Sequence, residues 1–438
     1  MPEKAKDAQE KVRDLQIKLY LAAKRSKDRR FHALYDRAYR TDVLERAWRE
    51  VEKNHGAAGV DGVSIEAIRE SGVGTFLDEL ESELKEGRYR PLPVRRVAIP
   101  KRSGGGTRNL GVPAVRDRVV AAALKVVMEP IFEADFLECS FGFRPKRSTH
   151  QGLDRIRGGI RRGHCWVVDA DIQSFFDEIP QGKLVEVLRE RISDRRVLGL
   201  VKSWLRAGVL VGGSVLHPET GTPQGGVISP LLANIYLHQL DRAWEERYRQ
   251  LGELTRYCDD LVIVCRTRAD AEAALQALLQ LLAELGLRIA EAKTRLVDVD
   301  GDEGFDFLGF HHRKVRSFRN PSVMFLASWP GHAALQRARK RVRELCARRN
   351  CLRPIGDVIT DLNRFLRGWG EYFRKGNSTR HFHRLDLYVG RRLARFISKK
   401  HDRSGLGYGY RVMGASGNDL GLYHLVGTVG AAAAHAVR

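Results

Sequence analysis

The 438-residue chain lacks several features that would assign it to a common class of protein. It has no apolar run long enough to span a membrane, and its first residues mix charges too freely for a secretory signal peptide. Its six cysteines contain no Cys-x-x-Cys pair, so we expect reduced thiols rather than a disulfide framework or a zinc site. No repeat of about 20–50 residues is apparent. These absences favour a cytoplasmic globular protein without a membrane segment.

What the chain has in excess is positive charge. The formal net charge is +22, and residues 331–412 alone carry 21 lysines and arginines against six acidic residues. Self-repulsion of this size is tolerated when a polyanion neutralises it, and the planar fork of arginine suits phosphate oxygens. The charge therefore predicts nucleic-acid binding, with a basic, solvated surface as the alternative. Candidate phosphate contacts in this segment are Arg364, Arg367, Arg391 and Arg392.

The order of expected elements favours an α+β fold. Strands and helices mix without the regular alternation of a doubly wound parallel sheet. A helix is expected over about 114–130, ending at Pro130, and the chain becomes helical and basic from about residue 330. We predict four segments: an N-terminal helical extension (1–53), a mixed region (54–312), a basic helical domain (313–412) and a C-terminal tail (413–438). In the basic domain, Trp369, Tyr372 and Phe373 are expected to pack as core.

Two pairs of carboxylates are the strongest local signal. Asp259 and Asp260 precede the apolar run Leu261–Val264, which predicts a β-hairpin with the acidic pair at its tight turn. Neighbouring anions repel each other, and a divalent metal ion is the obvious neutraliser. Asp169 and Asp171 lie two apart on one expected strand and therefore face the same side of its sheet. Together the strands would form a cage for two ions in phosphoryl transfer; the alternatives are a solvated turn and ordinary pairing with arginine.

Two glycine-rich segments could approach a ligand. In Thr222–Asn234, prolines bracket a glycine pair, and a helix beginning near Pro230 would present free N–H groups and a positive dipole end. Lys101 and Arg108 flank the loop Gly104–Gly106, which suits a triphosphate. An ordinary hairpin is the alternative for this loop, because it has neither the spacing of a Walker motif nor a strand–GxGxxG–helix context.

These motifs form an ordered set. The set comprises Ala57–Gly62, Ile99–Lys101, Phe141–Pro145, Asp169–Asp171 with Phe175–Asp177, Thr222–Asn234, Tyr257–Asp260, Phe307–Phe310 and Leu362–Phe373. It resembles the reverse transcriptases of the bacterial group II intron type over about residues 35–400, and the last motif resembles the signature of their maturase, or thumb, domain. Cys258 stands where the family usually has alanine. Because no Cys/His cluster follows the basic domain, the zinc-containing endonuclease domain of some relatives is expected to be absent.

The resemblance implies a fold, an activity and a set of site residues. The fold would be a right-hand polymerase with fingers and palm built on antiparallel sheet, followed by a helical thumb. The activity would be RNA-directed DNA synthesis with Mg²⁺. The implied roles are catalytic metal binding by Asp171, Asp259 and Asp260 with Asp169 auxiliary; nucleotide binding by Lys101, Arg108 and Gln224; a ring under the sugar 2′ position from Phe176; and a position near the leaving pyrophosphate for Lys293.

The implied partners are an RNA template with a DNA primer, dNTPs and the structured parent intron RNA, whose splicing and mobility the protein would assist. Two other interpretations stay open. One is a domesticated relative that serves repair or phage defence. The other is an RNA-binding maturase that acts only in splicing, although the intact acidic residues argue against it. The sequence does not indicate the oligomeric state.

Overall fold

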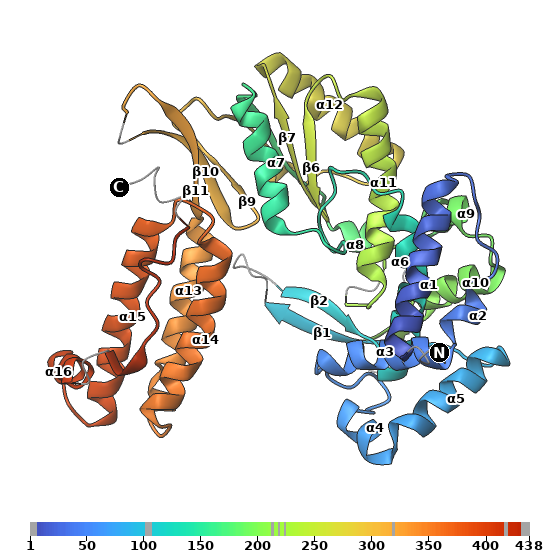
Figure 1. Cartoon of the computed structure of the whole chain (residues 1–438), viewed down its shortest axis with the longest axis horizontal. Helices are drawn as coiled ribbons and strands as arrows, with labels where there is room; N and C mark the ends of the chain where they lie inside the picture. Colours follow the sequence, from blue (N-terminus) through green and yellow to red (C-terminus); the bar gives the residue numbers. More distant parts are fainter. Residues whose placement is uncertain are drawn as a thin grey trace, which may run out of the picture. The chain divides into compact units, whose positions relative to one another are not determined.

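The computed structural model describes residues 7–100, 107–211, 214–217, 220–222, 225–317, 320–415 and 419–430, with the backbone alone for Arg108 and Asp419 (Figure 1). Contacts divide the chain into two compact units. The first unit comprises Met1–Gly152, Ala170–Ile263 and Ala269–Thr294, and the second comprises Leu153–Asp169, Val264–Arg268 and Arg295–Arg438. No helix among the described residues combines the length and apolar character needed to cross a membrane.

The N-terminal part of the first unit is helical. Its helices are α1 (Ala8–Arg25), α2 (Tyr35–Ala38), α3 (Thr41–Lys53), α4 (Ile65–Ser71), α5 (Val73–Lys85) and α6 (Val115–Glu133). Helices α1 and α3 pack on α6, which is buried along most of its length. The prediction that this last helix ends at Pro130 is wrong, because α6 runs on to Glu133. Proline cannot donate to the carbonyl four residues back, and the Gln16 side chain of α1 donates to the Val126 carbonyl instead, at 3.2 Å.

A small sheet follows in the first unit, with strand order β2-β1-β4-β5. Its strands are β1 (Val94–Pro100), β2 (Thr107–Val112), β4 (Val209–Val211) and β5 (Ser214–Leu216). The pairs β1–β2 and β4–β5 are antiparallel, whereas β1 pairs with β4 in parallel. The glycine-rich loop near residue 104 falls between β1 and β2 and lies outside the described residues.

The second sheet has the strand order β6-β7-β3-β8. Its strands are β3 (Trp166–Asp171), β6 (Glu253–Tyr257), β7 (Asp260–Cys265) and β8 (Arg295–Asp298). After Asp260, every residue of β7 is buried, which agrees with its continuous apolar sequence. The helices in this part of the sequence are α7 (Thr149–Arg161), α8 (Phe175–Glu178), α9 (Gln181–Arg191), α10 (Arg195–Arg206), α11 (Ser229–Arg247) and α12 (Arg268–Glu284), followed by the short helix η1 (Glu291–Lys293).

The C-terminal part of the second unit joins an antiparallel sheet to a set of helices. The sheet has the order β11-β10-β9, with β9 (Phe305–Phe307), β10 (Phe310–Arg316) and β11 (Met324–Pro330). The helices are α13 (His332–Leu345), α14 (Ile355–Phe373), α15 (Thr379–Lys400) and α16 (Gly407–Ala415). The Trp369 ring packs on those of Phe373 and Phe382, at 4.7 and 5.6 Å between centroids, as core aromatics do. The mixture of largely antiparallel sheets and helices confirms the α+β class.

Candidate active site

The acidic motif forms the predicted hairpin. Cys258 and Asp259 make its two-residue turn between β6 and β7, and Asp260 opens β7. Cys258 has a φ of +61°, a left-handed conformation that is uncommon for a residue other than glycine. Gly142 lies so close to this turn that a Cβ at its position would be 2.6 Å from the Cys258 nitrogen, so only glycine fits there. The backbone of the Phe141–Pro145 motif therefore packs directly against the acidic turn.

A buried arginine holds this hairpin from inside. The Arg256 side chain is fully buried, as is that of Asp241 on α11, and the Arg256 Nε and Nη2 donate to the two Asp241 oxygens at 2.7 and 2.5 Å. Arg256 Nη1 donates to the Cys258 carbonyl at 3.1 Å and to Asn234 Oδ1 at 3.0 Å. Asn234 in turn donates through Nδ2 to the Gly142 carbonyl at 2.7 Å. The network therefore fixes both sides of the acidic turn to α11.

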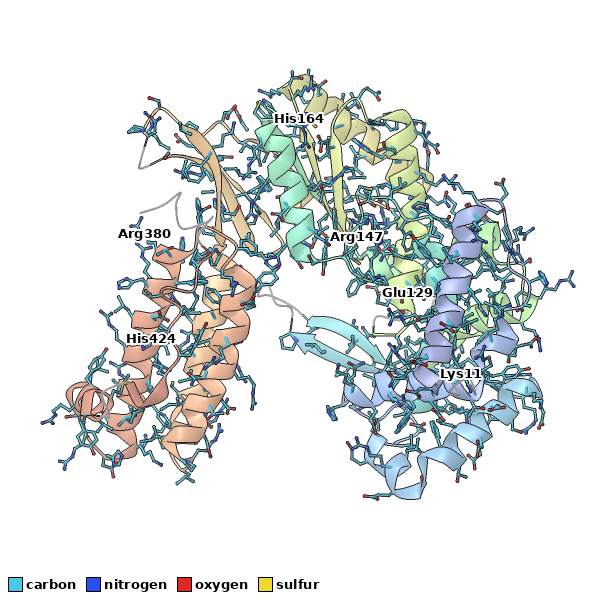
Figure 2. All side chains as sticks on the ribbon, in the orientation of Figure 1. Lys11, Glu129, Arg147, His164, Arg380 and His424 are labelled. Atoms are coloured by element: carbon cyan, nitrogen blue, oxygen red, sulfur yellow. The ribbon has the colours of Figure 1, made fainter. Side chains whose placement is uncertain are left out.

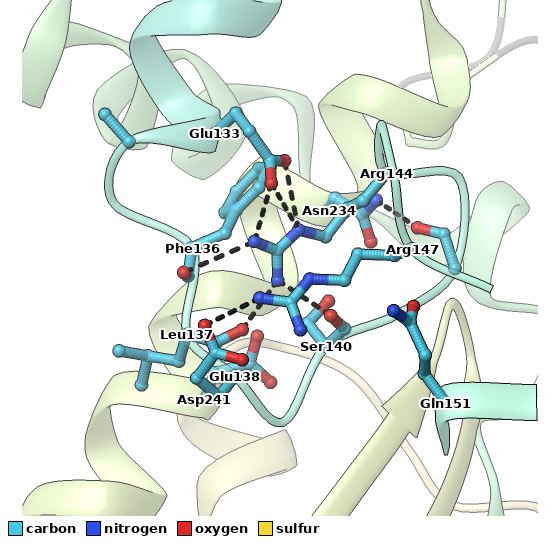
Figure 3. A network of polar contacts seen from close by, with 12 residues as sticks. Glu133, Phe136, Leu137, Glu138, Ser140, Arg144, Arg147, Gln151, Asn234 and Asp241 are labelled. Atoms are coloured by element: carbon cyan, nitrogen blue, oxygen red, sulfur yellow. Dashed lines mark hydrogen bonds and ion pairs between the residues drawn. The ribbon is translucent and has the colours of Figure 1, made fainter. Parts of the chain in front are cut away.

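A second buried arginine extends the same support, as Figure 3 shows. Arg144 forms an ion pair with Glu133 at the end of α6, with Nη2 and Oε1 2.8 Å apart. Its Nη1 also donates to the carbonyls of Leu137 and Ser140, at 2.6 and 2.7 Å. The Ser140 hydroxyl accepts from Arg256 at 2.8 Å, so the two arginines share one loop. Buried guanidinium groups paired this completely are structural groups rather than ligand-binding groups.

The structure brings together four of the predicted site residues. Asp171 lies at the end of β3, and the Lys293 ammonium of η1 donates to its Oδ2. That hydrogen bond raises the pKa of Lys293, and the negative charges of Asp171, Asp260 and Asp259 raise it further. Lys293 thus lies within electrostatic range of all three carboxylates. A backbone hydrogen bond of 2.8 Å from Ala290 to the Asp171 carbonyl holds η1 beside the strand.

The donor set has the chemistry that a divalent ion requires. Carboxylate oxygens are the preferred ligands of hard divalent cations, and Lys293 shows that the cluster attracts positive charge. Within the described ranges, however, no three acidic, histidine or cysteine side chains lie close enough together to enclose a metal ion. Asp169, the expected auxiliary carboxylate, accepts from Arg295 of β8 at 3.1 Å. This is the arginine pairing that the sequence left as an alternative.

Phe176 is the predicted nucleotide residue that the structure describes most fully. Its ring is half-buried, whereas the neighbouring Phe175 is only 2% exposed. The Phe176 carbonyl accepts from the Thr222 nitrogen at 2.7 Å. Gly221 allows this approach, because it has a φ of +87° and a Cβ there would lie 2.9 Å from the Phe176 oxygen. The first residues of the glycine-pair segment therefore lie against α8.

The remaining predicted nucleotide residues are only partly described. Lys101 and Gln224 lie outside the described residues, and Arg108 is described only by its backbone, which pairs with Ile99. Beyond Gln224, Gly225 approaches β2 so closely that a Cβ would lie 2.5 Å from the Gly111 oxygen. Thr222 and Gly225, on the two sides of Gln224, thus contact α8 and β2, the elements that contain Phe176 and Arg108.

The four predicted RNA-binding arginines differ in their surroundings. Arg364 is 80% exposed and lies 3.6 Å from an Asp361 oxygen on the same helix, α14. The Arg367 guanidinium lies over the Tyr423 ring, 4.6 Å from its centroid. On α15, Arg391 is exposed, whereas Arg392 is half-buried and its Nε has no hydrogen-bond partner among the described residues. The side chains of Arg364, Arg367 and Arg391 are thus exposed, whereas that of Arg392 is half-buried.

Comparison with known proteins decides the family. A model of the reverse transcriptase (RNA-dependent DNA polymerase) family matches residues 99–312, and one of the group II intron maturase-specific domain matches residues 335–412. The protein YkfC of Escherichia coli K12 is 38% identical over 59% of this chain and 76% of its own length. The chain belongs to the group II intron type of reverse transcriptase. Polymerases of this kind use divalent metal ions.

Two further matches cover less of the chain. The group II intron-encoded protein LtrA of Lactococcus lactis is 37% identical over 49% of this chain but only 35% of its own length. Among solved structures, a partial Cas6-RT-Cas1–Cas2 complex is 25% identical and covers 57% of this chain and 41% of its own, with a TM-score of 0.36. That score is too low to support an argument about the fold.

The buried network around Arg256 is what sequence reasoning missed. The signal was present, because Arg256 interrupts an otherwise uncharged stretch, Leu254–Cys258, on the first strand of the hairpin. A charge in a buried strand needs a buried partner of opposite sign. The sequence contains many acidic residues, however, and only the tertiary structure identifies Asp241 as the partner.

Proposed function

We propose that the protein copies RNA into DNA with two Mg²⁺ ions held by Asp171, Asp259 and Asp260. The observation that supports this proposal most is the Lys293 ammonium, which donates to Asp171 and whose pKa is also raised by the charges of Asp260 and Asp259. When bound, Mg²⁺ would activate the attacking primer oxygen and neutralise charge on the phosphates. The fingers and palm would extend over residues 54–312 and the thumb over 313–412, with 1–53 as an N-terminal extension and 413–438 as a tail.

Lys293 has a role of its own in this proposal. Because neighbouring carboxylates raise its pKa, it remains protonated at neutral pH. A cation at the edge of a carboxylate cluster can attract the phosphates of an incoming nucleotide and stabilise the charge of the departing pyrophosphate. If Asp171 served as a metal ligand, the Lys293 ammonium would contact the phosphates instead.

The nucleotide site would lie where the glycine-pair segment meets α8. Lys101 and Arg108 would hold the triphosphate, and Gln224 would contact the sugar and base. Phe176 would exclude a ribose by contact with its 2′-hydroxyl. The contacts of Thr222 and Gly225 support this proposal, because they bring the segment on each side of Gln224 against the elements that contain Phe176 and Arg108.

The second role we propose is binding of the parent intron RNA, to assist its splicing and mobility. The matched maturase-specific domain and the excess of arginine over acidic residues in the same segment support it. Exposed Arg364 and Arg391, together with Arg367, would contact phosphates, and Arg392 would contribute through its half-buried side chain.

A double variant tests the catalytic assignment. Asp259→Ala with Asp260→Ala should abolish primer extension on an RNA template, because the metal ligands are removed. The same variant should bind RNA with nearly unchanged affinity, since the basic surface supplies that affinity. Glu272→Ala on α12, an acidic residue outside the cluster, is the control. Primer extension that survives in the double variant would refute the role of the acidic pair.

A further inference from the structure

A pocket in the second unit is not explained by the carboxylate cluster. It has a volume of about 590 Å³ and is lined by residues of the β9–β11 sheet, α13 and α15. Its size falls within the roughly 300–1,000 Å³ of typical small-ligand sites. The pocket begins beside the first turn of α15, which Arg380 marks in Figure 2.

One wall of the pocket is aromatic. Trp329 of β11 lies directly opposite His311 of β10 in the strand register, with the two ring centroids 5.1 Å apart. The His381 ring of α15 lies nearly parallel to Trp329, at 10° and 6.1 Å between centroids. Trp329 is half-buried, so part of its ring faces solvent in the pocket. An indole held in this way offers a flat surface on which a nucleobase can stack.

The wall formed by the helices is cationic. Arg339 of α13 and Arg384 of α15 line the pocket, and both side chains are exposed. Within the part of the chain that the structure describes, neither arginine has a carboxylate at ion-pair distance. The pocket's own acid, Asp306, is bonded to His311, whose Nδ1 lies 2.6 Å from its Oδ1. Two guanidinium groups are therefore left to bind an anion from outside.

The protonation state of His381 agrees with a pocket that has one aromatic wall and one cationic wall. Burial lowers the pKa of His381 to about 4, and the charges of Arg384, Arg380 and Arg339 contribute to that lowering. Its ring is therefore neutral at physiological pH, and the positive charge of the pocket is concentrated on the arginines. The Arg339 guanidinium lies over the Tyr388 ring of α15, 5.8 Å from its centroid.

We propose that this pocket holds one unpaired nucleotide of a bound nucleic-acid strand, with its base against Trp329 and its phosphate against Arg339 and Arg384. The proposal rests on the proposed function only in assuming that the protein binds nucleic acid. An inorganic anion would make no use of the aromatic wall, and an apolar ligand would leave the guanidinium groups unpaired. A paired base cannot enter, because its faces are covered by neighbours in the helix.

The test is a scan with abasic sites, measured as binding without metal or dNTP. The probes are labelled RNA hairpins with a single-stranded 5′ or 3′ tail, in which the paired stem fixes the position of the tail on the protein. One abasic nucleotide is placed at successive positions along each tail. For the wild-type protein, an abasic site at one tail position should weaken binding about tenfold, the order of one stacking contact. Trp329→Ala should bind the intact RNA about tenfold more weakly, and the same abasic site should then cost nothing more.

Matched variants separate stacking from charge. Trp329→Phe keeps a ring and should preserve the abasic effect. Arg339→Gln and Arg384→Gln should each reduce the log–log salt slope by about 0.7, as expected when one phosphate of a single strand is no longer neutralised. Arg337→Gln, also on α13 but outside the pocket, is the charge control and should leave the abasic effect unchanged. If circular dichroism shows that Trp329→Ala is unfolded, Trp329→Leu replaces it, because leucine keeps an apolar side chain without a ring.

The outcomes are decisive. An abasic effect that disappears in the Trp329 variant supports the pocket. The scan is repeated with DNA tails, and whether the effect occurs with RNA tails alone or with both identifies the strand that the pocket holds. No sensitive position on any tail, or an abasic penalty that Trp329→Ala and Trp329→Leu leave unchanged, overturns the proposal. Failure of the polymerase proposal would appear instead as absent primer extension, which this binding assay does not measure.

Discussion

Arginine–aspartate pairs in two regions of the molecule have opposite surroundings. Beneath the acidic hairpin, Arg256 and Asp241 are both fully buried and joined by two hydrogen bonds. On α14, Arg364 is 80% exposed and only loosely paired with Asp361, at 3.6 Å. A buried charge must be fully paired, whereas an exposed one gains little from its partner. The first arginine is therefore committed to the fold, and the second is available to a ligand.

The contrast teaches that the number of arginines does not predict where nucleic acid binds. The first unit also contains many arginines, yet Arg144 and Arg256 are paired with the carboxylates of Glu133 and Asp241 and with backbone carbonyls. Exposure and the absence of a strong partner distinguish the arginines that we propose bind RNA from those that hold the fold together. Variants in the two regions should therefore change different properties of the protein.

The largest effect is expected for the buried pair. Arg256→Met should lower the free energy of unfolding by about 3–5 kcal/mol, because it leaves Asp241 buried and unpaired. It should also reduce primer extension, since the Cys258 carbonyl loses a donor. Urea denaturation and primer extension measure the two effects.

A matched double variant sharpens this prediction. Arg256→Met with Asp241→Leu should recover much of the stability of the wild type, because no unpaired charge remains in the core. Equal stabilities for Arg256→Met and the wild type would show that the pair is not needed for the fold, and the contrast between the two regions would fail.

The exposed arginines should affect binding and not stability. Replacing Arg364, Arg367 and Arg391 by glutamine should reduce the log–log salt slope of RNA binding by about 0.7–0.9 for each phosphate that is no longer neutralised. The free energy of unfolding should change by no more than about 0.5 kcal/mol for each exposed site. An unchanged slope in the triple variant would show that these side chains form only a solvated surface. Arg392→Gln is a useful comparison, because its half-buried side chain should also affect stability.

The smallest effect is expected for two neighbouring rings, of which Phe175 is buried and Phe176 is half-buried. Phe176→Val removes a half-buried ring and should raise the use of rNTP relative to dNTP, on the order of tenfold, because a steric barrier is relieved. Phe175→Val removes a buried ring and should mainly lower stability. The ratio of kcat/KM for the two nucleotides, measured in both variants, decides the assignment. A shift in sugar selectivity confined to Phe175→Val would reverse the roles of the two rings.

The sequence by itself determined the family, the α+β class and the acidic hairpin. These features depend on local order: adjacent Asp259 and Asp260 before an apolar run are visible without coordinates, and the motifs occur in the order that the family requires. The aromatic packing of Trp369 and Phe373 was also correctly predicted, because large rings at helical spacing tend to be buried.

The tertiary structure decided which distant residues meet. Only the fold pairs Arg256 with Asp241 and puts Lys293 beside Asp171, which is 122 positions earlier in the chain. It also showed that a side chain from α1 lets α6 continue past Pro130, and that Trp329, Arg339 and Arg384 line one pocket. The physical reason is the same in each case. The free energy of a buried charge or of an unpaired carbonyl depends on the groups around it, and so does the ability of a ring to stack on a ligand. Those groups come from distant parts of the chain, so the local sequence does not contain them.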